Sequence, residues 1–173
     1  MICNILIELR NIQQNKYPHN VSIALDESFD SPYNCSMAKD IIHRAVKQAL
    51  IKEGWTIVGD PYPLQYAEFS LRADLAAERT SPPEAAVRRI IVEVKSFVGL
   101  SFIHQFQQAI GQYSMYRDAI ELNGLDYEVY LAVSNEAYQD NFYQTAVQNS
   151  IKKHDLKLVV VDIDGEQVLI WIN

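Results

Sequence analysis

The sequence predicts an α/β (α+β) fold in which a mixed central sheet is flanked by helices. Segments with helical spacing of apolar residues alternate with segments rich in β-branched residues, in the order αβββαβαββ. The passage 89–134 reads as strand, helix, strand, which is typical of a right-handed crossover between parallel strands. The first three strands have the sequence pattern of an antiparallel meander. Helices layered on a sheet bury the apolar faces of both kinds of element.

The first half of the predicted fold is one helix followed by three strands. The helix begins at Ala38 and ends at Gly54, and its apolar face consists of Ile41, Ile42, Ala45, Val46, Ala49 and Leu50. A short strand at 55–63 ends in a turn, and a second strand at 69–78 alternates apolar with more polar residues. After a proline-containing loop, the strand at 87–97 stands out by its β-branched residues.

The second half continues with two helices and three strands. Ser101 is a plausible N-cap for a long amphipathic helix, whose apolar stripe is Phe102, Ile103, Phe106, Ala109, Ile110, Tyr113 and Tyr116. A buried strand follows at 127–135, and then a helix at 136–154. The chain closes with two strands, at 156–164 and 166–173, joined by a tight turn.

Residues 1–36 differ from the rest of the chain because they are polar, rich in turn residues and without a clear period. A helical pattern starts immediately after Met37. These residues are either a functional N-terminal arm or an extension upstream of a start codon at Met37, and we favour the extension. The predicted domains are therefore an irregular extension at 1–36 and a folded domain at 37–173.

The composition is that of one soluble globular domain, with 173 residues, 49% hydrophobic and 21% charged. The net charge of -7 lacks the basic excess of a non-specific nucleic-acid binder. Any contact with nucleic acid must then come from a local basic patch, a bound metal or a partner. The chain has no signal peptide and no apolar run of about 18 residues, so we expect a cytoplasmic protein without a membrane segment.

Two charges interrupt the most apolar predicted strand, "RIIVEVKSF". Glu93 and Lys95 share one face of this strand, while Val92 and Val94 point to the other face. If the preceding strand pairs with it, Asp74 can meet Glu93 at one end of the sheet. Two converging carboxylates repel unless a cation holds them, and Mg²⁺ (or Mn²⁺) suits such a pair. A nearby Lys can orient or deprotonate an attacking water, so the pattern predicts phosphodiester hydrolysis.

The same residues resemble a known motif. "AD" at 73–74 and "VEVK" at 92–95 resemble the PD-(D/E)xK nuclease motif, with Ala73 in the place of Pro. The blocks "MAKDIIHRAVKQALIKEGWTI", "ADLAAE", "VEVKSF", "FQQAIGQY" and "VVVDID…WIN" together resemble the XisH family, small proteins described as factors that control excision of a DNA element interrupting a nitrogen-fixation gene. The resemblance covers nearly everything from Met37 onward.

That resemblance implies a restriction-endonuclease-like core, a role in DNA excision with DNA as substrate, and an XisI-type partner protein. It makes Asp74 and Glu93 the expected metal ligands and Lys95 the catalytic or water-orienting base. Many nucleases of this fold add a Glu from the first helix, and here that helix offers Asp40 and His43 instead. Accessory candidates on the long helix are Gln105 and Gln112. A second copy of the chain is a further candidate partner.

Two functional interpretations remain open, an endonuclease and a non-catalytic regulatory subunit of the same fold that acts through its partner. The intact Asp74, Glu93 and Lys95 favour the enzyme, whereas the sequence pI of about 5.0 favours the subunit. A Glu and a Lys two residues apart in a strand are, as a bare motif, more often a salt pair on a half-exposed sheet. A purely structural role is therefore the third interpretation.

Overall fold

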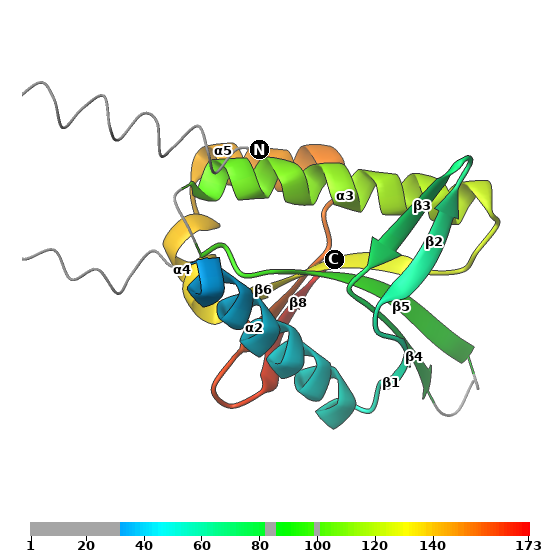
Figure 1. The fold of residues 1–173 in the computed structure, drawn as a ribbon, viewed down its shortest axis with the longest axis horizontal. Helices are drawn as coiled ribbons and strands as arrows, with labels where there is room; N and C mark the ends of the chain where they lie inside the picture. The colour runs from blue at the N-terminus through cyan, green and yellow to red at the C-terminus, as the bar shows by residue number, and fades with distance from the viewer. Residues whose placement is uncertain (1–31, 82–85, 99–100) are drawn as a thin grey trace, which may run out of the picture. The chain divides into compact units, whose positions relative to one another are not determined.

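The computed structural model describes residues 32–81, 86–98 and 101–173 (Figure 1). Within these ranges the chain forms four helices and eight strands. In chain order they are α2 (Pro32–Lys52), β1 (Thr56–Gly59), β2 (Tyr62–Tyr66), β3 (Phe69–Ala73), β4 (Leu75–Ser81), β5 (Ala86–Lys95), α3 (Phe102–Leu122), β6 (Glu128–Ser134), α4 (Asn135–Asn141), α5 (Thr145–His154), β7 (Leu158–Asp162) and β8 (Gln167–Ile172).

Six strands form the central sheet, in the order β1-β4-β5-β6-β7-β8. β5 pairs in parallel with β6, and β6 with β7, whereas the other neighbours are antiparallel. This mixed sheet with its helices confirms the predicted α/β (α+β) class. The antiparallel arrangement of the strands before α3, the parallel pair that α3 connects, and the final hairpin are also as predicted.

Two of the predicted strands are wrong in their extent, because each is divided between two sheets. The predicted strand 55–63 is β1 and β2, and the predicted strand 69–78 is β3 and β4. β2 and β3 pair only with each other, as a hairpin separate from the central sheet. Pro61 and Pro63 lack the N–H that a central strand must donate, which explains why the chain leaves the ladder there. Asp74 is the single residue between β3 and β4.

Two further boundaries differ from the prediction. The predicted helix 136–154 is interrupted between α4 and α5, where Phe142 is completely buried and its carbonyl oxygen accepts a 2.6 Å hydrogen bond from the Gln148 side chain. Helix α2 begins at Pro32, so residues 32–36, which the sequence predicts to be irregular, are helical. The rest of the predicted extension lies outside the described residues.

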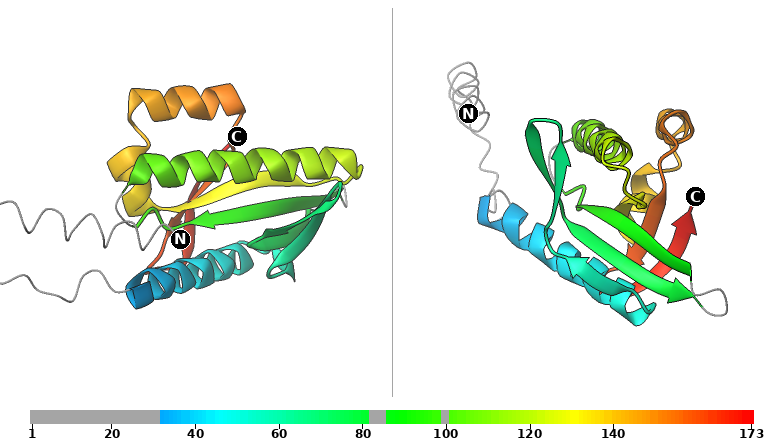
Figure 2. Two further views of the ribbon diagram at one scale, coloured as in Figure 1. Left: turned by 45° about the horizontal axis from the view of Figure 1, so that its top comes forward. Right: turned by 90° about the vertical axis from the view of Figure 1, so that its right-hand side faces the viewer.

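The central sheet has an apolar cluster on each face. Helix α2 covers one face, and α3, α4, α5 and the β2–β3 hairpin cover the other, as Figure 2 shows for α2 and α3. In β5, Val92 and Val94 belong to the cluster beneath α2, whereas Ile91 belongs to the cluster beneath α3. No helix within the described ranges is long and apolar enough to cross a membrane.

Candidate active site

The charged residues of β5 lie on the side of the sheet that α3 covers. Because side chains alternate along a strand, Glu93 and Lys95 share the face of Ile91. Lys95 Nζ lies 2.7 Å from Glu93 Oε1. The Glu93 side chain is 3% exposed and that of Lys95 is 18% exposed. The sequence prediction that these two residues meet on one face is therefore confirmed, and the ion pair they form is largely buried.

Asp74 joins this pair from the neighbouring strand. The β4–β5 ladder runs up to the pair Leu75 and Val92, so Asp74 follows at the position next to Glu93. Its Oδ2 accepts a 2.8 Å hydrogen bond from the backbone N–H of Val94. This bond ties Asp74 directly to β5. The structure thus brings Asp74, Glu93 and Lys95 together, as the sequence predicts.

The environment of Glu93 makes its ionised form more costly than it is in water. Burial is the main cause that raises the pKa of Glu93, and the charge of Asp74 raises it further. The ion pair with Lys95 and the hydrogen bond to Tyr116 act in the opposite direction without cancelling the effect. A second cation beside the two carboxylates would relieve both their repulsion and the cost of burying the charge.

A tyrosine on α3 completes the surroundings of Glu93. The Tyr116 hydroxyl lies 2.9 Å from Glu93 Oε2 and 2.9 Å from the backbone oxygen of Arg72. A hydroxyl has one proton to donate, and an ionised carboxylate and a carbonyl can only accept. Both contacts are hydrogen bonds at once when Glu93 is protonated, because Glu93 then donates to Tyr116 while Tyr116 donates to Arg72. Burial, followed by the charge of Glu93, raises the pKa of Tyr116.

The two glutamines predicted as accessory residues have different surroundings. Gln112 lies one helical turn before Tyr116 on α3, and its side chain acts to lower the pKa of Tyr116, against the larger effects of burial and of Glu93. Gln105 donates a 3.1 Å hydrogen bond to the carbonyl oxygen of Val98, in the segment after β5. Gln112 is therefore a neighbour of Tyr116, whereas Gln105 holds the chain that leads away from the site.

The accessory residues predicted on the first helix are placed elsewhere. His43 Nε2 lies 2.7 Å from Asp60 Oδ1, and Lys47 donates to the other oxygen of Asp60 at 2.7 Å. Asp40 is exposed on the same helix. Because α2 packs against the opposite face of the sheet from Glu93, His43 and Asp40 do not join the carboxylates.

Comparison with known proteins identifies the family. The family model described as "XisH protein" matches residues 36–169. The chain belongs to the XisH family. The crystal structure of an XisH family protein from Nostoc punctiforme PCC 73102 is 35% identical and superposes with a TM-score of 0.70, covering 78% of this chain and 100% of that one. The crystal structure of an fdxN element excision controlling factor protein from Anabaena variabilis shares 36% sequence identity with this chain. It superposes with a TM-score of 0.70 and covers 78% of this chain and 99% of that one. No match was found among the curated proteins.

Tyr116 is the site residue of this XisH chain that the sequence analysis missed. Its place in an apolar helical stripe indicates packing, and its ring is indeed in the core. The available signal was its spacing, because Gln105, Gln112 and Tyr116 lie seven and four residues apart and so share one face of α3. A helix face that carries polar side chains toward a charged strand indicates a polar contact beneath the helix.

The donors of this XisH site fit a hard divalent cation. Magnesium takes oxygen ligands and is commonly held by one or two carboxylates, with waters and substrate oxygens completing its shell. Asp74 and Glu93 supply that number of carboxylates, and burial with mutual repulsion gives them a reason to bind a cation. In the part of the chain that the structure describes, no group of three or more His, Cys, Asp or Glu residues could hold a metal.

Proposed function

We propose that this XisH protein hydrolyses phosphodiester bonds of DNA with Mg²⁺ or Mn²⁺, as part of the excision of a DNA element. The observation that carries the proposal is the convergence of Asp74, Glu93 and Lys95, two carboxylates and an ammonium, at the end of one sheet. These residue types resemble those of the PD-(D/E)xK motif, with Ala73 in the place of Pro. The excision role is supported by the name of the Anabaena variabilis relative, an fdxN element excision controlling factor.

In this proposal Asp74 and Glu93 hold the ion, and Lys95 acts on the attacking water. A bound Mg²⁺ supplies positive charge to the phosphate and lowers the pKa of a bound water. The Lys95 ammonium, partly exposed beside Glu93, orients that water and balances the negative charge that develops on the phosphate. The contact of Tyr116 with Glu93 keeps this carboxylate turned toward the site.

The charge of the protein suggests that an XisI-type partner contributes to DNA binding. Several cations that could contact phosphates are already paired with carboxylates, including Lys47 with Asp60 and Arg88 with Glu128. With a net charge of -7, the chain gains little from non-specific attraction to DNA. We propose that the partner supplies the positive surface that holds the substrate.

The same acidic charge favours a second candidate function. In this alternative the protein is a regulatory subunit without catalysis, and it acts on DNA excision only through its XisI-type partner. The trio of Asp74, Glu93 and Lys95 would then be a structural ion-pair cluster.

The first test is cleavage of plasmid and branched DNA with Mg²⁺ or Mn²⁺, with and without the partner. We expect metal-dependent cleavage that falls at least about a hundredfold in Glu93→Ala and Lys95→Ala. Lys157→Ala is the matched control, because Lys157 forms an ion pair of the same 2.7 Å length with Glu128 outside the site. Absence of metal-dependent cleavage under every condition, with partner binding intact, would reject the enzyme in favour of the regulatory subunit.

A further inference from the structure

Resting on this proposed function, we propose that Tyr116 is a positioning residue that sets the relative placement of the two metal-binding carboxylates. Its hydroxyl contacts two segments of the chain at once, Glu93 Oε2 on β5 and the Arg72 carbonyl oxygen on β3. Arg72 lies two residues before Asp74. One side chain on α3 therefore connects the strand that carries one carboxylate with the segment that carries the other.

Asp74 needs such a connection because neither ladder fixes it. The β2–β3 ladder ends with the pair Tyr62 and Ala73, and the β4–β5 ladder begins at Leu75. Asp74 is the residue at which the chain leaves one sheet for the other. Its own hydrogen bond comes from the Val94 N–H. The bond from Tyr116 holds the Arg72 carbonyl oxygen, two residues earlier and next to the buried Ala73. Loss of the second bond removes the hydrogen bond that ties the end of β3 to α3.

The polar tip of Tyr116 is held where water cannot replace it. The residue is 3% exposed and packs in the cluster beneath α3. Removing its hydroxyl takes away the polar partner of both Glu93 Oε2 and the Arg72 carbonyl oxygen, and a buried polar group left without a partner costs free energy. Glu93 is then free to turn toward Lys95 alone, so its second oxygen is no longer directed by α3.

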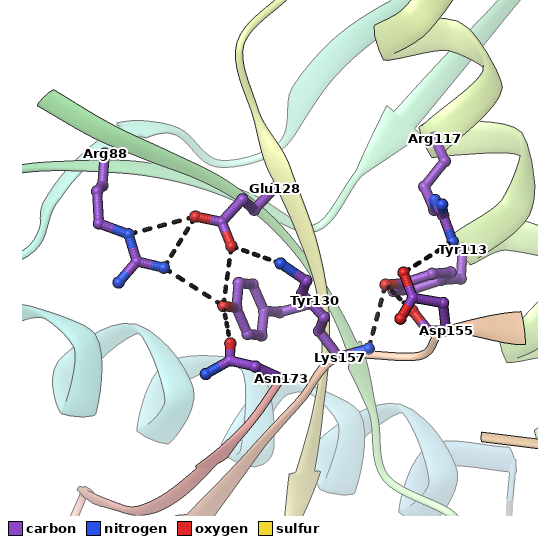
Figure 3. A network of polar contacts seen from close by, with 8 residues as sticks. All are labelled: Arg88, Tyr113, Arg117, Glu128, Tyr130, Asp155, Lys157 and Asn173. Carbon is purple, nitrogen blue, oxygen red and sulfur yellow. Dashed lines mark hydrogen bonds and ion pairs between the residues drawn. The ribbon is translucent and has the colours of Figure 1, made fainter. Parts of the chain in front are cut away.

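The same helix provides a matched control in Tyr113. This residue is 2% exposed. Its hydroxyl donates a 2.9 Å hydrogen bond to the Asp155 carbonyl oxygen and accepts a 3.1 Å hydrogen bond from the Lys157 N–H. Figure 3 shows these contacts between α3 and the chain that leads into β7. Tyr113→Phe thus removes a buried hydroxyl with two partners, as Tyr116→Phe does, but it leaves the carboxylates untouched.

The experiment compares Tyr116→Phe and Tyr113→Phe in the full chain. Thermal melts without metal are expected to show a similar loss of Tm for both variants, because both keep the ring and lose one buried hydroxyl. Titration with Mn²⁺, followed by the rise in Tm, is expected to need about tenfold more metal in Tyr116→Phe and the wild-type concentration in Tyr113→Phe. Cleavage by Tyr116→Phe is expected to recover toward the wild-type rate at high Mn²⁺.

Two results would overturn the positioning role: unchanged Mn²⁺ dependence in Tyr116→Phe, or an equal weakening in Tyr113→Phe. Both leave the proposed function standing, since the wild-type protein still binds Mn²⁺. Failure of the wild-type protein to respond to Mn²⁺ or Mg²⁺ at all would instead overturn the proposed function, together with the inference that rests on it.

Discussion

Replacing Glu93 with glutamine is expected to abolish metal-dependent cleavage while leaving the protein at least as stable as the wild type near neutral pH. Glutamine keeps the size of the side chain and can form hydrogen bonds with the same neighbours. Its amide oxygen accepts from Lys95, and its amide N–H donates to Tyr116, which donates to the Arg72 carbonyl oxygen. The gain from this complete set of hydrogen bonds is about 1 kcal/mol in the free energy of unfolding.

The pH dependence of that difference follows from the raised pKa of Glu93. Burial, and then the charge of Asp74, raise it above the ordinary value of 4.5. An acid whose pKa is higher in the folded state costs stability when it ionises, so the cost grows as pH rises from 4.5 through the folded-state pKa. The advantage of Glu93→Gln is therefore expected above that window and lost below it. Urea denaturation at a series of pH values measures it.

Asp74→Asn is the companion measurement, because it removes the second cause of the raised pKa. In that variant the advantage of adding Glu93→Gln should shrink. A Glu93→Gln protein that is markedly less stable than the wild type at every pH would contradict the conclusion that ionisation of Glu93 costs folding stability.

Replacing Lys95 with methionine is expected to have the opposite effect on stability. The change leaves Asp74 and the buried Glu93 together without the ammonium that lies 2.7 Å from Glu93. Loss of one partner costs about 3–5 kcal/mol for a fully buried pair and up to about 1 kcal/mol for an exposed one. Because Lys95 is 18% exposed, we expect a loss of about 1–3 kcal/mol, between these limits.

Two features distinguish this loss from a simple packing defect. First, Lys95 lowers the pKa of Glu93, so its removal raises that pKa further, and the loss should vanish once acid has protonated Glu93. Second, Mg²⁺ or Mn²⁺ should restore the Tm of Lys95→Met by more than it raises that of the wild type, because a divalent cation no longer competes with the ammonium for Glu93.

Lys157→Met is the control for the lysine substitution. Its ion pair with Glu128 is equally short, but Glu128 also accepts a hydrogen bond from Arg88 (Figure 3). The Glu128 side chain is 35% exposed. We expect a loss below about 1 kcal/mol and no metal response. Equal metal responses in the two lysine variants would show that the cation binds somewhere other than Asp74 and Glu93.

The part of the fold that depends on local pattern could be predicted from the sequence. The β-branched run at 87–97 and the apolar stripe of α3 define a strand and a helix independently of their neighbours, and both form. Period-2 alternation also placed Glu93 and Lys95 on one face, which their ion pair confirms. The meeting of Asp74 with Glu93 depended on assuming that neighbouring strands pair, and they do.

What the sequence could not provide is which elements exchange partners. Alternation continues from Phe69 to Leu75, across the junction at Asp74, so nothing local indicates that β3 joins β2 while β4 joins β5. The contact between Tyr116 and Glu93 depends on how α3 lies over the sheet, which is a tertiary property. For the same reason His43 was a reasonable candidate by residue type, and only the packing of α2 on the opposite face places it beside Asp60.

The hydrogen bonds that attach the β2–β3 hairpin to the region of α3 do not depend on which side chains the hairpin exposes. Besides its apolar packing, the hairpin is held by two hydrogen bonds to carbonyl oxygens. The Gln65 oxygen accepts from the Asn123 amide at 2.6 Å, and the Arg72 oxygen accepts from Tyr116. Backbone oxygens are present whatever side chain a position carries. The exposed side chains at 65 and 72 can therefore be replaced, and the surface of the hairpin changed, without loss of these two hydrogen bonds.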